Sequence, residues 1–119
     1  MNKVIADKWV KALRSGKYKQ AVGDLQNEVG YCCLGVLCDL GKKEGVDVPM
    51  TSSSALGDER ISGDELDDQP AVMEWSGIES SCGKVIVGNI TDMLTSLNDS
   101  DKYTFDQLAD VIEKEWEQL

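Results

Sequence analysis

The sequence predicts a small α+β domain that is mostly helical, with about four helices and a short sheet of two or three strands. Two observations predict the helices. Apolar residues recur at helical spacing near both ends of the chain, and the decapeptide YCCLGVLCDL (residues 31–40) is its most apolar stretch. The third observation predicts the sheet, because Lys84–Val87 is a short β-branched run between glycines. The 119 residues allow a single domain, 1–119, with one modest core.

The first helix is predicted over residues 3–14, and Ser15-Gly16 ends it because glycine is favoured just past a helix end. Residues 17–27 have no clear period, so we expect a short strand or an extended arm there. The apolar stripe of the helix has the spacing of one buried face and consists of Ile5, Ala6, Trp9, Val10 and Leu13.

The central helix is predicted over about Cys32–Lys43. We expect it to be buried on several sides, because apolar residues cover most of its circumference. Gly35 in its middle costs about 1 kcal/mol of helix propensity relative to alanine. This glycine therefore predicts the close approach of another backbone or of a ligand.

The second half of the chain is predicted to alternate loops with short elements. Residues 47–69 are expected to form a long acidic surface loop, and Pro70 opens a short helical turn that Gly77 closes. We expect the strand Lys84–Val87 to pair with the region of Tyr18. Two further helices are predicted: one marked by Ile90, Met93, Leu94 and Leu97 with Asn89 or Thr91 as its cap, and a last one from the capping box Thr104-Phe105-Asp106-Gln107 to about Glu117, burying Phe105 and Trp116.

Charge is distributed unevenly along the chain. The net charge is −10, yet residues 1–20 contain six lysines and arginines and one acid, for a local net charge of +5. An acidic chain repels the phosphates of long nucleic acid, so we expect no long nucleic-acid partner. No apolar run reaches the roughly 20 residues that span a bilayer, and no secretory signal is visible. We therefore expect no membrane association and a cytoplasmic protein.

The chain has no histidine, which removes the commonest general base and the commonest zinc ligand. A zinc site made of the four cysteines would need Cys32, Cys33, Cys38 and Cys82 to converge, and reduced, buried thiols are the expected state instead. Cys32 begins the central helix, where the pKa of a thiol is lowered, so Cys32 is either the one reactive cysteine or, like the others, only buried. Asp99 begins only a faint match to a calcium loop. Neither a metal site nor a cofactor is expected.

The best candidate for a ligand site is the loop that follows the first helix. Its cations suit phosphates, its glycine permits close backbone approach, its aromatic ring can stack on a base, and its amide can read the edge of the base. Lysines at a helix C-terminus also suit the helix dipole, so the alternative is a solvated surface. The residues of this loop expected to bind the ligand are Arg14, Gly16, Lys17, Tyr18, Lys19 and Gln20.

Four residues outside this loop complete the predicted ligand site. Cys32 is included for the reactive alternative, and Trp75 because it lies beside Gly77 and can line a pocket. Asn98 and Asp99 can bind ligand hydroxyls, although a turn that caps neighbouring helices would explain them too. The acidic stretch Asp58–Asp68 is either a solvated loop or a mimic of a phosphate backbone.

Several segments together resemble a known family. The N-terminal WVKALRSGKYKQ, the central YCCLGVLCDL, the later MEWSGI and the C-terminal LND before TFDQLADVIE are similar to a widespread family of small phage and prophage proteins. The resemblance implies a phage accessory protein that works in the cytoplasm of the bacterial host. Small phage proteins of this kind often counter host defence, and some hold cyclic nucleotide or cyclic ADP-ribose signals without cleaving them.

Three functions are compatible with these observations. We expect a non-catalytic binding module that sequesters a small anionic nucleotide signal, such as a cyclic nucleotide or cyclic ADP-ribose species, with a homo-oligomer as one possible form. The alternative is an acidic protein-interaction inhibitor that mimics nucleic acid and blocks a host defence protein. A metal-dependent nucleotide hydrolase has the least support, because neither a histidine nor a catalytic motif is present.

Overall fold

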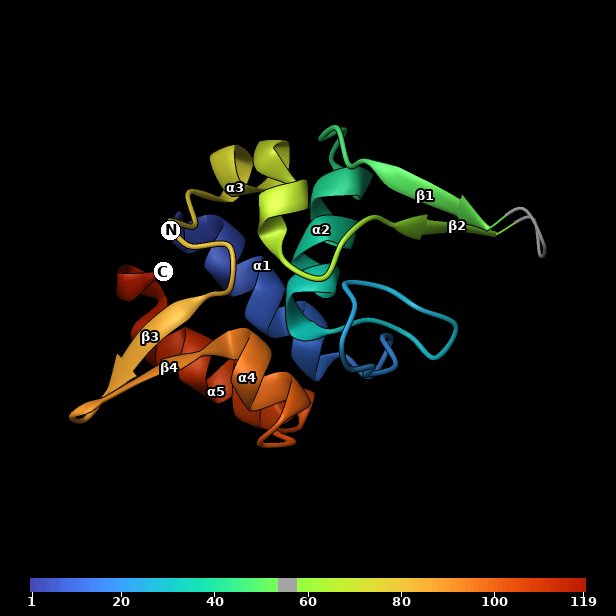
Figure 1. The fold of residues 1–119 in the computed structure, drawn as a ribbon. Helices are drawn as coiled ribbons and strands as arrows, with labels where there is room; N and C mark the ends of the chain where they lie inside the picture. The colour runs from blue at the N-terminus through green and yellow to red at the C-terminus, as the bar shows by residue number, and fades with distance from the viewer. Residues whose placement is uncertain (54–57) are drawn as a thin grey trace.

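The computed structural model of the chain describes residues 1–53 and 58–119 and shows a helical body from which two β-hairpins extend (Figure 1). The described residues form five α-helices and two separate two-stranded antiparallel sheets, which confirms the predicted α+β class. Two short 3₁₀ helices, Leu66–Asp68 and Trp116–Gln118, follow β2 and α5. The elements are α1 (Lys3–Arg14), α2 (Cys33–Lys43), β1 (Met50–Ser53), β2 (Asp58–Ile61), α3 (Pro70–Ser76), β3 (Lys84–Val87), β4 (Ile90–Met93), α4 (Leu94–Asp99) and α5 (Phe105–Glu115).

Helix α1 has the predicted bounds and the predicted buried stripe. Asn2 begins the helix, because its side-chain oxygen accepts the backbone N–H of Ile5 at 3.2 Å. Ser15 ends it, and Gly16 turns the chain away with a φ of +74°. The buried stripe packs mainly against α5 and also against α2, so α1 joins the two ends of the chain in one core.

Helix α2 lies at the centre of the core, as its composition predicts. Every residue from Cys33 to Cys38 is buried. The indole N–H of Trp9 donates to the carbonyl oxygen of Cys33 at 2.8 Å, which satisfies the one polar group of a fully buried side chain. A Cβ atom at Gly35 would lie 1.8 Å from the carbonyl oxygen of Leu25, so the predicted close approach of another backbone is confirmed.

The connection from α1 to α2 forms no strand with β3. Its two arms instead bond to each other: the N–H of Tyr31 donates to the carbonyl of Lys19 at 2.8 Å, and that of Ala21 donates to the carbonyl of Tyr31 at 2.7 Å. Gly30 is required here, because a Cβ atom at this position would lie 2.0 Å from the oxygen of Lys19. These contacts keep Lys17 and Tyr18 beside the end of α1.

The expectation of a long surface loop over residues 47–69 was wrong. Strands β1 and β2 pair in an antiparallel hairpin in which Met50 faces Ile61, although residues 54–57 lie outside the described residues. The Gln69 side chain, itself fully buried, donates to the carbonyls of Pro49 and Ser62 at 2.9 Å and closes the base of this hairpin. Leu66 is also fully buried, so the segment contributes to the core. Tertiary contacts of this kind leave no periodic signal in the sequence.

Two predictions for residues 84–99 also need correction. Strand β3 has the predicted bounds, but it pairs with β4 rather than with the Tyr18 region. The predicted helix around Ile90 therefore begins only at Leu94, and Met93 occupies the N-cap position expected at Asn89 or Thr91. The two-residue turn Gly88-Asn89 carries the signal for this hairpin, since its glycine has a φ of +65°.

The remaining elements follow the prediction closely. Pro70 begins α3 and Gly77 ends it with a φ of +74°. Thr104 and Gln107 form both halves of the capping box that begins α5. Trp116 lies in the following 3₁₀ helix and is half-buried rather than buried in the core. None of the described helices has the length and apolarity needed to cross a membrane.

Candidate functional site: a lysine-lined groove

A groove of about 410 Å³ lies between α1 and the C-terminal end of α2, where the chain turns after α1. Its volume falls within the range of small-molecule sites in proteins. Four lysines and one glutamate line it, on a chain whose net charge is −10. We call it the lysine groove, and its lining residues are Lys8, Lys11, Ala12, Ser15, Lys17, Tyr18, Leu40, Lys43 and Glu44.

Helical spacing explains how α1 and α2 supply these side chains. Residues at positions 8, 11, 12 and 15 lie on one face of α1, next to the stripe that faces the core. Positions 40, 43 and 44 lie on one face of the last turn of α2 and its C-cap. The packing of α1 against α2 brings the two faces together. Leu40 and Ala12 therefore supply the apolar part of the groove, and the lysines stand around it.

The lysines of the groove differ in their ion pairs. Lys8 contacts Glu44 at 3.0 Å and Lys43 contacts Asp39 at 3.2 Å. Across residues 1–53 and 58–119, Lys11 and Lys17 have no ion-pair partner. Exposed pairs such as Lys8–Glu44 contribute roughly 0–1 kcal/mol, so an incoming phosphate can replace the glutamate with little loss. Two unpaired cations and one exchangeable cation are thus available to an anion.

Tyr18 forms one wall of the groove through a network of three polar side chains. Its hydroxyl donates to the carboxylate of Asp39 and accepts from the ammonium group of Lys43 at 3.1 Å. Burial raises the pKa of Tyr18, and the hydrogen bond to Asp39 raises it further. The hydrogen bonds to Tyr18 and Asp39 likewise raise the pKa of Lys43. At neutral pH the tyrosine is therefore neutral and the lysine charged, and the positive charge of this wall is balanced by the carboxylate of Asp39.

The ring of Tyr18 is already in contact with other groups. Its centroid lies 5.2 Å from that of Tyr31 in an edge-to-face arrangement, and the Lys43 nitrogen lies 5.3 Å from its centroid. These contacts leave less of the Tyr18 ring exposed to a ligand. The sequence predicted that a base would stack on this ring, and the contacts disfavour such stacking. The groove is better suited to bind an anionic group than to stack a base.

A larger cavity of about 690 Å³ lies on another face of α1, between α1 and α5. Its charges are mostly neutralised, because Lys3 pairs with Asp7 at 3.2 Å and Arg14 pairs with Glu113. Trp116 and Val10 supply its apolar surface. Lys11 borders this cavity as well as the lysine groove, so three cations face two acids here, whereas four lysines face one glutamate in the groove. The lysine groove is for that reason the better candidate for an anion.

The structure places only part of the predicted ligand loop in the groove. Lys17 and Tyr18 line it, and the backbone of Gly16 lies open between Ser15 and Lys17. The guanidinium of Arg14 turns instead to α5, where it bonds to Asp110 at 2.6 Å and to Glu113. Lys19 contributes its backbone carbonyl to the Tyr31 contact, and its side chain does not line the groove.

Gln20 and Asn98, predicted to bind ligand, instead form a structural hub. Asn98 is buried, and its side-chain oxygen accepts from the Gln20 amide at 2.8 Å and from the Cys33 N–H at 3.3 Å. Its amide nitrogen donates to the carbonyl of Ala21 at 2.9 Å and to Asp99 at 2.7 Å. These bonds tie α4 to α2 and to the connection between α1 and α2. The hydrogen-bonding capacity of Asn98 is fully used inside the protein.

The environment of Cys32 favours the buried alternative over the reactive one. Cys32 does occupy the N-cap position of α2, but it is only 4% exposed. Burial raises the pKa of its thiol to about 11. The ring of Trp75 packs over Gly41, where a Cβ atom would lie 3.2 Å from it. Neither residue contributes to the lysine groove.

Thiol labelling at neutral pH should distinguish the four cysteines. All are free, and Cys82 is half-buried whereas Cys32, Cys33 and Cys38 are buried. Burial raises the pKa of each of these three thiols and so lowers the fraction of reactive thiolate. We expect iodoacetamide at pH 7.5 to modify Cys82 first, and the other three only after denaturation, as measured by peptide mass spectrometry. Fast modification of Cys32 in the folded protein would contradict this assignment.

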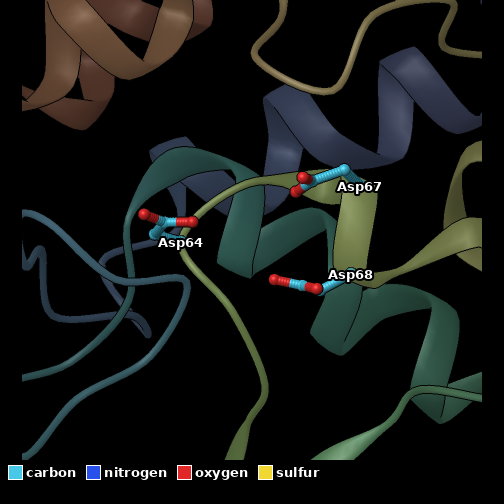
Figure 2. Close-up of side chains that lie close together, drawn as sticks. All are labelled: Asp64, Asp67 and Asp68. Carbon is cyan, nitrogen blue, oxygen red and sulfur yellow. The ribbon is translucent and has the colours of Figure 1, made fainter.

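A second polar cluster lies in the 3₁₀ helix after β2 and in the turn before it. Figure 2 shows the side chains of Asp64, Asp67 and Asp68, whose carboxylate oxygens all lie within 4.8 Å of one another. All three side chains are exposed. Exposed acids of this kind are common on acidic proteins, so the cluster by itself defines no metal site. It does concentrate negative charge on this side of the chain.

Sequence reasoning missed most of the groove. Lys8, Lys11 and Lys43 are absent from the predicted site, because lysines along a helix or near its C-terminus are usually solvated. The available signal was the spacing of Lys8, Lys11 and Ser15 on one face. Nothing in the sequence indicates that this face lies against Leu40 and Lys43, because that depends on how α1 crosses α2.

The fold and the groove define a small α+β domain that carries a cationic groove on an acidic chain. The protein belongs to a family described as a domain of unknown function (DUF8296), whose model matches residues 1–116. No curated protein and no solved structure matches the chain significantly.

Proposed function

We propose that the protein binds a small anionic nucleotide in the lysine groove and holds it without chemical change. The observation that carries this proposal is the pair of unpaired cations, Lys11 and Lys17, beside Lys43, whose charge is shared with Asp39. In the cell of a bacterial host, such binding would lower the free concentration of a nucleotide signal. A phage accessory protein that counters host defence would act in this way.

The shape and chemistry of the groove support binding rather than catalysis. Phosphate oxygens would meet three ammonium groups, while Leu40 and Ala12 offer an apolar surface to a ribose or a base. The titratable groups that line the groove are lysines, Tyr18 and Glu44, with Asp39 bonded to Tyr18. Tyr18 is hydrogen-bonded to Asp39, and Glu44 accepts a hydrogen bond from Lys8. None of these three groups is therefore free to act as a general base.

Thermal stabilisation by candidate ligands tests this proposal. Cyclic nucleotides, cyclic ADP-ribose isomers, NAD and ADP-ribose would each be added to the purified protein. A ligand at 100 times its dissociation constant stabilises the folded state by about 2.7 kcal/mol, which raises the melting temperature by several degrees. We expect one compound to produce this shift and to be recovered intact by chromatography. Turnover of that compound would contradict sequestration and would mean that the protein is an enzyme.

The double substitution Lys11→Glu with Lys17→Glu should weaken binding of that compound at least tenfold, because two attractive charges become repulsive. The matched control is Lys102→Glu with Lys114→Glu, which changes the net charge equally at exposed lysines outside the groove. Calorimetric titration measures both affinities, and unchanged melting temperatures without ligand show that both variants fold. Equal loss of affinity in the two variants would mean that net charge, and not the groove, determines binding.

A further inference from the structure

The β3–β4 hairpin exposes an unusual amount of apolar surface. Four of the seven large hydrophobic side chains that are exposed in the described residues lie on it: Ile86 is 50% exposed, Val87 43%, Ile90 68% and Met93 40%. The hairpin also extends away from the helices (Figure 1). Exposed apolar residues gathered in one place, unlike single ones, indicate an interaction surface.

The two outer edges of this hairpin differ. The side chain of Gln118 closes the β3 edge, because it accepts the N–H of Ile86 at 2.7 Å and donates to the carbonyl of Ile86 at 3.0 Å. On β4, Thr91 faces Ile86 in the register, so its backbone groups also point outward. Within residues 1–53 and 58–119, neither the N–H nor the carbonyl of Thr91 has a hydrogen-bond partner. The β4 edge is therefore open to another strand at Thr91, whereas the N–H of Met93 already donates to the Asp92 carboxylate at 2.9 Å.

An acidic groove adjoins the open edge. Met93 lines it together with Asp64, Glu65 and Asp99, and no lysine or arginine is among its lining residues. Neighbouring residues of a strand point to opposite faces, so Met93 shares one face with Ile86, while Ile90 shares the other with Val87. Lys84 lies opposite Met93 on the first face and Asp92 lies on the second, so a strand added at the β4 edge would meet the acidic groove at the Met93 end and the side chains of Ile90 and Val87 nearer the turn.

These charges select the kind of partner. A second copy of the chain would bring its own Asp92 and acidic groove toward the same edge, and each copy has a net charge of −10. Like charges placed close together across an interface oppose association. A basic segment has the complementary charge, and apolar side chains within it would contact Ile90 and Val87.

We propose that β4 and the acidic groove beside it form a docking site for an extended segment of another protein that contains both apolar residues and lysine or arginine. Thr91 supplies backbone hydrogen bonds, Ile90 contacts the apolar side chains, and Asp64, Glu65 and Asp99 bind the basic ones. The site is separate from the lysine groove, and the two share no lining residue.

Fluorescence anisotropy with a labelled peptide of about ten residues, alternating valine and lysine, tests this docking site. The wild-type protein should bind the peptide, more weakly as salt is added, and should not bind an alternating valine–glutamate peptide. Ile90→Ser with Met93→Ser should weaken binding at least tenfold, and so should Asp64→Asn with Glu65→Gln. Val4→Ser with Val22→Ser is the matched control, since it removes exposed apolar residues elsewhere and should bind like the wild type.

Each other outcome would overturn this inference. If the wild-type protein does not bind the peptide, or if Ile90→Ser with Met93→Ser binds it as tightly as the wild type, β4 is not the docking edge. Loss of binding in the acidic variant alone would mean simple charge attraction. A dimer seen by sedimentation and abolished by Ile90→Ser with Met93→Ser would show that a second copy occupies the edge. Lys11→Glu with Lys17→Glu should retain peptide binding, so this inference and the nucleotide proposal can fail separately.

Discussion

Replacing Gly35 with alanine should destabilise the protein by about 3 kcal/mol. Helix propensity alone predicts the opposite, since alanine is favoured over glycine in a helix by about 1 kcal/mol. The added Cβ atom would lie 1.8 Å from the carbonyl oxygen of Leu25 and 2.7 Å from its carbonyl carbon. These are backbone atoms that cannot rotate away, so α2 or the Leu25 segment must move inside a packed core.

Gly41→Ala is the matched control for this prediction, because Gly41 also lies in α2. There the added Cβ atom would meet the ring of Trp75 at 3.2 Å, and this half-buried side chain can shift. We expect a change of less than about 1 kcal/mol, because helix propensity offsets a mild contact. Urea unfolding curves measure both variants. A Gly35→Ala protein as stable as the wild type would contradict the backbone contact.

Replacing Asn98 with leucine should cost about 4 kcal/mol, although the two side chains are similar in size. Leucine cannot form the side-chain hydrogen bonds of Asn98. The Cys33 N–H, the Ala21 carbonyl and the Gln20 amide therefore each lose a hydrogen-bond partner. Each buried polar group that loses its partner costs about 1–3 kcal/mol. The Gln20 amide keeps its bond to the carbonyl of Tyr103 at 2.8 Å, so it loses less than the others.

Thr95→Ala in the same helix is the control, since Thr95 is half-buried and its hydroxyl has no hydrogen bond within the described residues. It should change the free energy of unfolding by less than about 1 kcal/mol. A double-mutant cycle with Gln20→Ala then measures the coupling across the hub. If Asn98→Leu unfolds like the control, the hub is not structural and the ligand role predicted for Asn98 returns.

The candidate site was predicted in part. The cationic, glycine-containing turn after α1 does border a groove, through Lys17 and Tyr18. Arg14 was expected in the site because it is near in sequence, yet its side chain leaves the helix on the face that meets α5. Asn98 was expected there because polar residues in a turn often bind ligands, yet it is buried and its side chain forms hydrogen bonds with backbone groups. Sequence distance and residue type could not distinguish these outcomes.

The sequence by itself determined the features that depend on a few neighbouring residues. The bounds of α1, the stop at Ser15-Gly16, the capping box at Thr104 and the buried central helix all follow from local periodicity and capping. Gly35 also belongs here, because a glycine inside an apolar helix signals a close contact even when its partner is unknown.

Only the tertiary structure decided which residues far apart in the chain meet. Lys8 contacts Glu44 across 36 positions, and Gln118 closes the edge of β3 across 32. The pairing of β3 with β4, and the hairpin within residues 47–69, were hidden for the same reason. Their stability comes from packing and hydrogen bonds with distant segments, and these depend on how the helices cross rather than on the local order of residues.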